Sequence, residues 1–182
     1  MTGKVIWITG LSGAGKTTLA KQLYLRLQKN KMRPILLDGD LLRLIFKTDN
    51  IEEQSYSRKS RINLGLKYGS LCKVLSSQGF IVIVATISMF HEIYAWNRDN
   101  LENYLEIYLK VPLDELYLRD GKKIYQDYKD GMLSNVAGLD LSVDEPLSSD
   151  LTYDFVRQPF LWDTSTNLIN DLMAQLEKRS LL

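Results

Sequence analysis

The sequence predicts an α/β fold in which a mostly parallel, five-stranded sheet carries helices on both faces. Short apolar runs alternate with longer segments of helical periodicity along the chain. The run at 5–9, for example, is rich in β-branched and aromatic residues and is closed by glycine, which is typical of a buried parallel strand. Strands separated by helices indicate crossover units and a parallel sheet. The 182 residues suffice for one large core, so we expect a single domain over residues 1–182.

The first strand and helix enclose a glycine-rich loop. Residues 5–9 are apolar and are followed by Gly10. The helix after the loop begins near Gly15, and leucines recur at every fourth position between residues 19 and 27. That spacing gives the helix one apolar face to lay on the sheet.

The remaining elements follow in the same alternation. The segment 122–149 has no clear periodicity and is rich in Lys, Asp, Gly and Ser, as lids and binding loops commonly are. We therefore expect a lid there. The other predicted elements are strands at 34–37, 80–87, 104–111 and 151–155, a long helix through 64–75, a helix whose first turn holds Pro112, and a final amphipathic helix through 168–176.

Composition and charge exclude several classes of partner. No stretch approaches the roughly 20 apolar residues of a membrane helix, and the first residues do not resemble a secretory signal, so we expect a cytoplasmic protein without a membrane partner. Lys plus Arg is 23 against 22 for Asp plus Glu, without a long basic run, which argues against nucleic-acid binding. The single cysteine, Cys72, is interpreted as a core residue on a helix.

The pattern G-x-x-x-x-G-K-[ST] at residues 10–17 indicates a phosphate-binding loop and a P-loop NTPase-type, three-layer fold. Glycines let consecutive backbone N–H groups point at phosphate oxygens, and the helix that follows adds its positive dipole end. Lys16 would reach the β- and γ-phosphates, and the Thr17 hydroxyl would bind Mg²⁺. The predicted nucleotide contacts of the loop are Gly10, Leu11, Ser12, Gly13, Ala14, Gly15, Lys16, Thr17 and Thr18.

An acidic pair, Asp38 and Asp40, follows the second predicted strand. In an open α/β sheet this places both carboxylates beside the phosphate loop. One carboxylate could orient metal-bound water while the other accepts a proton from an attacking hydroxyl. Alternatively, Asp40 caps a helix that begins at Leu41. The strand at 80–87 ends without a carboxylate and no guanine-reading motif is found, which argues against a switch GTPase.

Taken in series, these motifs resemble the adenylylsulfate (APS) kinase family over roughly residues 4–155. The resemblance implies transfer of the γ-phosphate of MgATP to the ribose 3′-hydroxyl of a nucleotide acceptor. Its segments are the phosphate loop, Leu37-Asp-Gly-Asp-Leu-Leu-Arg43, Tyr56-Ser57, Arg61, Ala85-Thr-Ile-Ser88, Arg119-Asp-Gly-Lys-Lys-Ile-Tyr125, Gly131, Asn135, Gly138-Leu-Asp140 and Glu145-Pro146.

By position, the resemblance also implies roles for single residues. Asp40 would be the general base, with Lys16 and Lys122 acting on the transferring phosphate; Asp38 would support Mg²⁺ through water, and Arg119 would lie against the ATP base. Ser88 occupies the place of a serine sometimes described as a phosphorylated intermediate, which in-line transfer does not need. The acceptor would contact Asp38, Asp40, Arg43, Tyr56, Arg61, Ile87, Ser88, His91, Lys122, Asn135 and Val136.

The departures from the family pattern concern the acceptor. The run at 60–66 lacks paired arginines, the run at 86–93 lacks a proline and basic residues and carries His91, and Val136 replaces an aromatic residue that usually stacks on the acceptor's adenine. Lost stacking and hydrogen bonds would be enough to change the preferred acceptor. His91 is equally well explained as a half-buried residue at a helix start.

The segments 85–93, 96–100 and 103–112 look most like a branch of the family associated with capsule gene clusters, some of whose members phosphorylate cytidine diphosphoramidate. This acceptor is favoured over APS. Kinases of nucleosides, nucleoside monophosphates or shikimate, and a non-catalytic ATP-binding module, remain as rivals. Relatives commonly dimerise, and the resemblance leaves a homodimer open.

Overall fold

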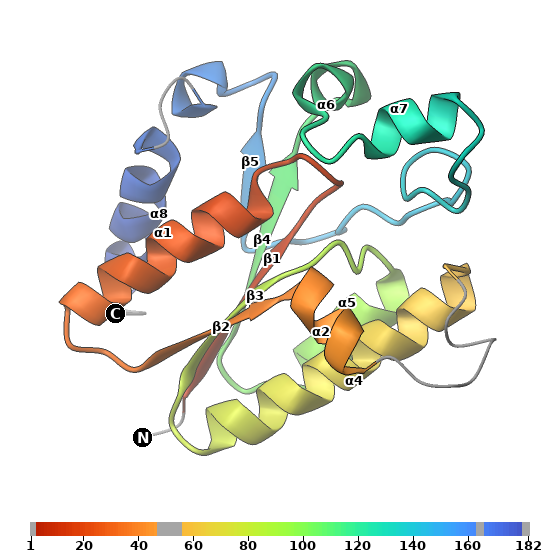
Figure 1. Ribbon diagram of the computed structural model, residues 1–182. Helices are drawn as coiled ribbons and strands as arrows, with labels where there is room; N and C mark the ends of the chain where they lie inside the picture. Colours follow the sequence, from red (N-terminus) through yellow and green to blue (C-terminus); the bar gives the residue numbers. More distant parts are fainter. Residues whose placement is uncertain (1–2, 47–55, 163–165, 180–182) are drawn as a thin grey trace.

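A five-stranded sheet, parallel throughout, forms the centre of the computed structural model, which describes residues 3–46, 56–162 and 166–179. The strand order is β2-β3-β1-β4-β5, so β1 is central: the chain passes from β1 to the edge strand β2, returns to β3 beside β1, and then continues to β4 and β5 on the other side (Figure 1). The predicted α/β class is thereby confirmed. The strands are β1 (Lys4–Thr9), β2 (Pro34–Asp38), β3 (Ile81–Ala85), β4 (Tyr104–Lys110) and β5 (Leu151–Asp154).

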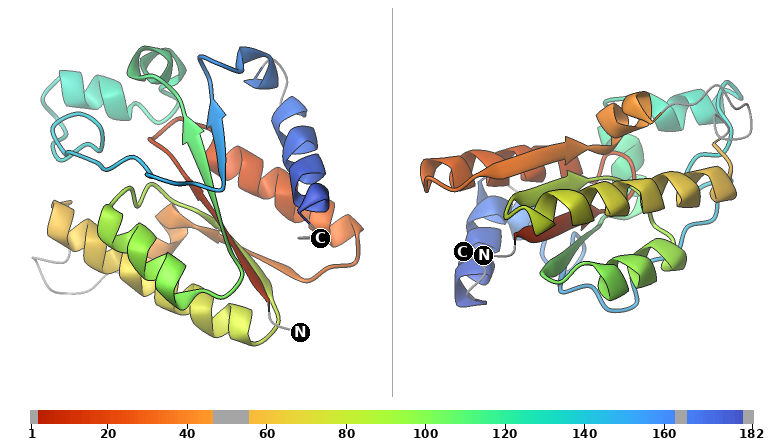
Figure 2. Two further views of the ribbon diagram at one scale, coloured as in Figure 1. Left: turned by 180° about the vertical axis from the view of Figure 1, so that it is seen from behind. Right: turned by 90° about the horizontal axis from the view of Figure 1, so that it is seen from below.

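Helices cover both faces of the sheet, which makes three layers. On one face lie α1 (Lys16–Lys29) and α8 (Asn167–Lys178), and on the other lie α4 (Arg58–Ser77) and α5 (His91–Asn100) (Figures 1 and 2). Shorter elements stand near the carboxyl ends of the strands. These are α2 (Gly39–Ile45), α6 (Leu113–Arg119), α7 (Ile124–Lys129) and the 3₁₀ turn η1 (Pro159–Trp162).

The alternation of side chains along β1 divides the apolar core between the two faces. Ile6 and Ile8 pack with the buried leucines of α1 and α8. Val5 and Trp7 point the other way and pack with α4, where Cys72 is fully buried. Burial raises the pKa of the Cys72 thiol to about 12, so this cysteine is a core residue, as predicted, and is not a reactive thiolate.

Three local expectations differ from the structure. The strand predicted at 80–87 ends at Ala85, because the backbone leaves the sheet and Ser88 adopts a positive φ of 29°. Pro112 is the N-cap of α6, one position before the first turn. The segment predicted as an irregular lid contains α7, whose six residues are too few to show a helical period.

The parallel arrangement decides where a site can form. Strands β1, β2 and β3 are neighbours that end at the same edge, so the loops after them meet there. In the part of the chain that the structure describes, no helix has both the length and the apolar character needed to cross a membrane.

Candidate active site

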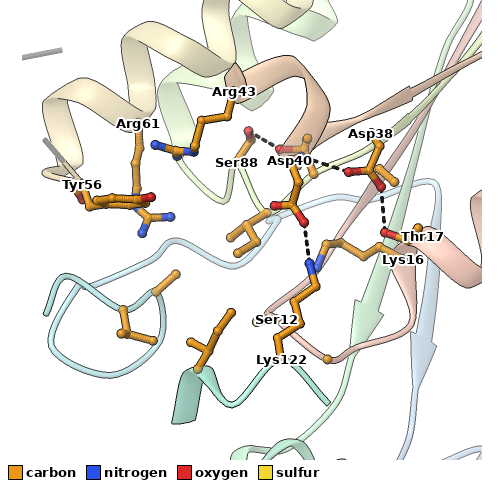
Figure 3. A pocket seen from close by; sticks show the side chains of 18 of the residues that line it. Ser12, Lys16, Thr17, Asp38, Asp40, Arg43, Tyr56, Arg61, Ser88 and Lys122 are labelled. Carbon is orange, nitrogen blue, oxygen red and sulfur yellow. Dashed lines mark hydrogen bonds and ion pairs between the residues drawn. The ribbon is translucent and has the colours of Figure 1, made fainter. Parts of the chain in front are cut away.

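A cavity of about 570 Å³ opens at the carboxyl edge of the sheet. Its walls come from the phosphate loop, the β2–α2 junction, α4, the segment after β3, and the segment from the end of α6 through Ala137 (Figure 3). Most residues predicted from the sequence line it: Ser12, Gly13, Gly15, Lys16, Thr17, Thr18, Asp38, Asp40, Arg43, Tyr56, Arg61, Ile87, Ser88, Arg119, Lys122, Asn135 and Val136. Gly10, Leu11, Ala14 and His91 are not among the lining residues.

Glycine is required at both ends of the phosphate loop. Gly10 has a φ of 147°, and a Cβ there would lie 2.6 Å from the carbonyl oxygen of Leu109. Gly15 has a φ of 93° and directly precedes α1. Side chains are disfavoured in both conformations, so the loop can curl only with glycine at these positions. The N-terminus of α1 consequently faces the cavity, as an anion site requires.

Lys16 reaches back over the loop and donates a hydrogen bond to the Leu11 carbonyl oxygen at 2.7 Å. The pKa of its ammonium is lowered to about 8, chiefly by burial and also by the nearby Lys122, while Asp40 and Asp38 act in the opposite direction. An anion beside Lys16 would favour the charged form and restore the pKa. A bound phosphate would therefore stabilise the charged form of the Lys16 side chain.

Asp38 links the second strand to the phosphate loop. One of its carboxylate oxygens accepts a hydrogen bond from the Thr17 hydroxyl at 2.9 Å, and the other accepts from the backbone N–H of Asp40 at 2.9 Å. Asp38 is thus the N-cap of α2. The alternative that Asp40 caps a helix beginning at Leu41 is wrong, because α2 begins at Gly39, one residue before Asp40.

Because Asp38 and not Asp40 caps α2, the Asp40 carboxylate points into the cavity and pairs with Lys122. Its Oδ2 lies 2.5 Å from Lys122 Nζ, although both side chains are largely exposed (Figure 3). Lys122 belongs to the predicted lid and Asp40 to α2, so this pair joins the two sides of the cavity. The arrangement brings one carboxylate and two lysines, Lys16 and Lys122, to the same cavity.

The donor set around Thr17 and Asp38 fits Mg²⁺. A hydroxyl and a carboxylate oxygen already lie within hydrogen-bond distance, and Mg²⁺ prefers oxygen ligands. No group of three or more His, Cys, Asp or Glu side chains that could hold a metal occurs among the described residues. A magnesium ion held mainly by water and substrate phosphates needs no such cage.

Two arginines and a tyrosine form the opposite end of the cavity. The guanidinium carbons of Arg43 and Arg61 lie 4.7 and 5.4 Å from the ring centre of Tyr56. Arg61 also donates to the carbonyl oxygens of Tyr56, at 3.0 Å, and Asn135, at 2.8 Å. Burial and the neighbouring Arg43 lower the Arg61 pKa to about 10. Two cations held this close favour an anionic ligand between them.

Asn135 and Val136 are held by a turn within the lid. Asn135 has a positive φ of 57°, and the Asp140 carboxylate accepts from the backbone N–H groups of both residues at 2.7 Å. Desolvation raises the pKa of Asp140, but these and two further backbone hydrogen bonds give a net lowering. Asp140 therefore orients the turn that carries Val136, whose side chain is buried at the cavity wall.

Ser88 is nearly buried, and its hydroxyl shares a hydrogen bond of 2.9 Å with the Thr86 hydroxyl. No hydrogen bond from Ser88 to a carboxylate or histidine is found within the described ranges, so no activating base accompanies it. This favours a contact role over a nucleophilic one. The assignment of Ser88 as a site residue stays a prediction.

His91 starts α5 outside the cavity. Its side chain is exposed, which makes the expectation of a half-buried histidine wrong, and its backbone N–H donates to Asp144 at 3.1 Å. The expected contact with the acceptor is not supported by this position. Tyr68 and Phe90 also line the cavity, and the sequence analysis missed them. The spacing of apolar residues in a helix or strand does not distinguish a cavity wall from the core.

The lid rests on the phosphate loop through contacts that were not predicted. The Tyr125 hydroxyl of α7 donates to the Ser12 carbonyl oxygen at 2.8 Å, and its ring is buried. A Cβ at Gly138 would lie 2.9 Å from the Leu11 side chain. Lid and loop are therefore packed together, although neither contact leaves a signal in the local sequence.

Fold and site together define a P-loop phosphotransferase with a hydroxyl acceptor. The sequence model described as adenylylsulphate kinase matches residues 2–154, and the chain therefore belongs to the adenylylsulphate kinase family.

Named relatives agree with this assignment. The chain is 44% identical over 142 residues to the cytidine diphosphoramidate kinase of Campylobacter jejuni, covering 78% of this chain and 81% of that protein. It is 38% identical over 152 residues to the adenylyl-sulfate kinase of Pseudomonas aeruginosa, covering 82% and 76%. The Mycobacterium tuberculosis APS kinase CysC, solved with AMPPNP and APS, superposes with a TM-score of 0.82 at 25% identity, covering 97% and 98%. The chain is thus an enzyme of the kinase class.

Proposed function

We propose that this enzyme transfers the γ-phosphate of MgATP to the ribose 3′-hydroxyl of cytidine diphosphoramidate, a cytoplasmic step toward capsular phosphoramidate groups. The observation that carries the reaction is the convergence of Lys16, Asp40 and Lys122 in one cavity. The observation that favours the acceptor is Val136 at the cavity wall, together with the similarity to the C. jejuni enzyme.

ATP and Mg²⁺ are proposed as donor and metal. The M. tuberculosis relative was solved with the ATP analogue AMPPNP, and the present loop offers the same kind of helix N-terminus, lysine and hydroxyl. Thr17 and Asp38, the latter through water, would hold the metal, which supplies charge neutralisation at the phosphates. Lys16 would contact the β- and γ-phosphates.

Asp40 is proposed as the general base. Its carboxylate is not used as a helix cap, faces the cavity, and forms an ion pair with Lys122. A donor phosphate would compete for Lys122, leaving Asp40 to accept the proton of the acceptor hydroxyl. The hydroxyl oxygen would form its bond to the γ-phosphorus as the bond from that phosphorus to the β–γ bridging oxygen breaks, and ADP would leave. The two lysines would then stabilise the charge that develops on the transferring phosphate.

The acceptor end suits a nucleotide with a phosphate-bearing tail and a small base. Arg43 and Arg61 would bind the phosphates, held in place by Tyr56. Val136 stands where the family usually has an aromatic platform for adenine, so the wall offers apolar contact without a stacking ring at that position. A cytosine ring, which is smaller than adenine, would need less of such a platform.

APS is the alternative acceptor, because the relatives at 38% and 34% identity are named adenylyl-sulfate kinases and the arginine pair would also suit APS. A binding module without catalysis is disfavoured, since a pure ATP binder needs neither a carboxylate base nor the Lys122 contact to it. A homodimer and a single domain over the whole chain stay predictions.

The proposal is tested by measuring ADP release with MgATP and, separately, no acceptor, cytidine diphosphoramidate, APS, cytidine and adenosine. We expect the largest kcat/KM for cytidine diphosphoramidate, a smaller value for APS and background rates otherwise. A larger value for APS would overturn the acceptor and keep the kinase. No stimulation by any nucleotide acceptor would overturn both.

A further inference from the structure

Helix α2 carries two residues of the cavity but has little core of its own. Asp40 and Arg43 both point from it toward the cavity (Figure 3). Of its seven residues, all of which the structure describes, Leu42 alone is buried, while Leu41 and Leu44 are exposed. A helix of about two turns is marginal without tertiary contacts. The position of Asp40 therefore depends on what α2 rests against.

Tyr68, on the neighbouring helix α4, contacts α2 at both ends (Figure 1). Its hydroxyl donates to the carbonyl oxygen of Gly39, the first residue of α2, at 3.3 Å. Its ring packs against that of Phe46, the C-cap of α2, with ring centres 5.9 Å apart. Leu42, which lies between these two positions, belongs to the same apolar cluster as Tyr68. Tyr68 thus supports α2 along its length.

The peptide group between Gly39 and Asp40 is held at both of its polar atoms. Its carbonyl oxygen accepts from Tyr68, and its N–H donates to the Asp38 carboxylate at 2.9 Å. The end of β3 confines it further, because a Cβ on Gly39 would lie 3.0 Å from the Thr86 hydroxyl oxygen. Since a peptide group is planar, fixing both polar atoms fixes the direction in which the Asp40 Cα and its side chain are presented.

The Tyr68 hydroxyl is available as a permanent donor. Burial raises its pKa above the ordinary value of 10.0; Arg43 opposes this shift, and Asp40 and Asp38 add to it. The hydroxyl therefore keeps its proton near neutral pH. The residue is 2% exposed although it lines the cavity, so little water can compete for the hydrogen bond to Gly39.

We propose that Tyr68 is a positioning residue for the reaction: by holding the Gly39 carbonyl, its hydroxyl fixes the peptide plane from which Asp40 reaches the acceptor hydroxyl. This inference rests on the proposed role of Asp40 as general base, but not on the identity of the acceptor. Without the hydrogen bond the peptide group can rotate and carry the carboxylate out of line. In Tyr68→Phe the ring still packs against Phe46, so α2 stays in place and only this bond is lost.

The experiment measures kcat, the acceptor KM and the ATP dissociation constant for the wild type and Tyr68→Phe, with cytidine diphosphoramidate as acceptor or with APS if that gives the larger kcat/KM. Tyr153→Phe is the matched control, because Tyr153 is also buried and donates to Asp171 at 2.9 Å, but in the apolar cluster on the other face of the sheet. We expect kcat to fall about tenfold in Tyr68→Phe, since misplacement by about 1 Å can cost about 10²-fold. The two binding constants should stay within about twofold, and Tyr153→Phe should keep full turnover.

The double variant Asp40→Asn/Tyr68→Phe shows whether Tyr68 acts through Asp40. If it does, removing the hydroxyl costs nothing further once the carboxylate is gone, and the double variant turns over as slowly as Asp40→Asn alone. The same loss of kcat in both backgrounds would overturn the inference, because the effect would then be independent of the base.

Unchanged kcat in Tyr68→Phe, or an ATP affinity that falls as much as kcat does, would also contradict the proposed role of Tyr68. A different pair of results tests the function beneath it. If no nucleotide acceptor stimulates the wild type, or if Asp40→Asn keeps full turnover, the proposed function itself fails and the inference fails with it.

Discussion

The two ends of the cavity, proposed above as the donor half and the acceptor half, are built in different ways. On the donor side the backbone does the positioning: glycines with positive φ shape the loop, and Lys16 and Thr17 are held by hydrogen bonds to the Leu11 carbonyl and to Asp38. On the acceptor side long side chains meet from α2, α4 and the lid, and Tyr56 is 52% exposed. A site formed by the backbone tolerates few substitutions, because each one changes the path of the chain. A site formed by side chains can be altered by substituting one residue at a time.

The largest expected effect separates chemistry from donor binding. Asp40→Asn removes the proposed base while keeping the shape of the side chain, and we expect kcat to fall by about 10² or more with the ATP dissociation constant nearly unchanged. Steady-state turnover and ATP titration measure the two quantities. Asp99→Asn, an exposed aspartate on α5, is the matched control and should be neutral. Unchanged turnover in Asp40→Asn would remove this residue as the base.

The next effect tests the backbone-built half. Gly10→Ala forces a Cβ to within 2.6 Å of the Leu109 carbonyl oxygen at a φ of 147°, so the loop must shift. Strain of this kind costs about 1–3 kcal/mol. We expect the affinity for ATP to fall about tenfold or more, whichever acceptor is present. We also expect a lower Tm. Gly131→Ala, in an open place with a φ of 73°, carries the backbone strain without the clash and serves as the control. Retained ATP affinity in Gly10→Ala would contradict the backbone account.

The features that depend on local sequence could be predicted, and those that depend on contacts between distant segments could not. The five strands and the phosphate loop were predicted because apolar runs and glycine patterns are visible within short segments of the sequence. The cap of α2 was not, since Asp38 and Asp40 are equally good capping residues and only the position of the helix start decides between them. Contacts between distant segments, such as Arg61 with Asn135, leave no local pattern.

His91 shows a site assignment that stays a prediction, and Tyr68 shows a cavity residue that the sequence did not reveal. His91 was placed by its position in a series of family motifs, and the structure leaves its side chain exposed outside the cavity. Tyr68 lies within the predicted helix through 64–75, but its hydroxyl donates to the Gly39 carbonyl oxygen at 3.3 Å and the residue lines the cavity. The spacing of apolar residues predicts which face of a helix is buried, but not whether that face contacts the core or a cavity.

A smaller effect should appear when the acceptor half alone is altered. Val136→Phe restores an aromatic ring at the cavity wall, and we expect kcat/KM to rise severalfold for APS and to fall for cytidine diphosphoramidate, because stacking favours the larger base. The KM for ATP should not change. Parallel assays with both acceptors measure the ratio, and Val136→Ile, which adds volume without a ring, is the control. A ratio that moves equally in both variants would attribute the effect to volume.

The smallest effect concerns the anchor of the lid rather than either half of the cavity. Asp144 pairs with Arg58 at 2.6 Å and accepts from the His91 backbone N–H, so it ties the end of the lid to α4 and α5. The Arg58 hydrogen bond comes first among the causes that hold the Asp144 pKa below its ordinary value of 3.8. The Asp144 carboxylate binds a proton less readily in the folded state than in the unfolded state. Its contribution to the free energy of unfolding is therefore complete above the ordinary pKa.

The stabilisation must therefore disappear as the pH falls through the lowered pKa, and it should not vary between about pH 5 and pH 7. Arg58 is 38% exposed, so we expect only about 1 kcal/mol of unfolding free energy from the pair. Urea unfolding of the wild type and Asp144→Asn across pH measures it, with Asp130→Asn as the control. A wild-type advantage that persists below the lowered pKa, or that grows there, would show that the carboxylate charge of Asp144 does not anchor the lid.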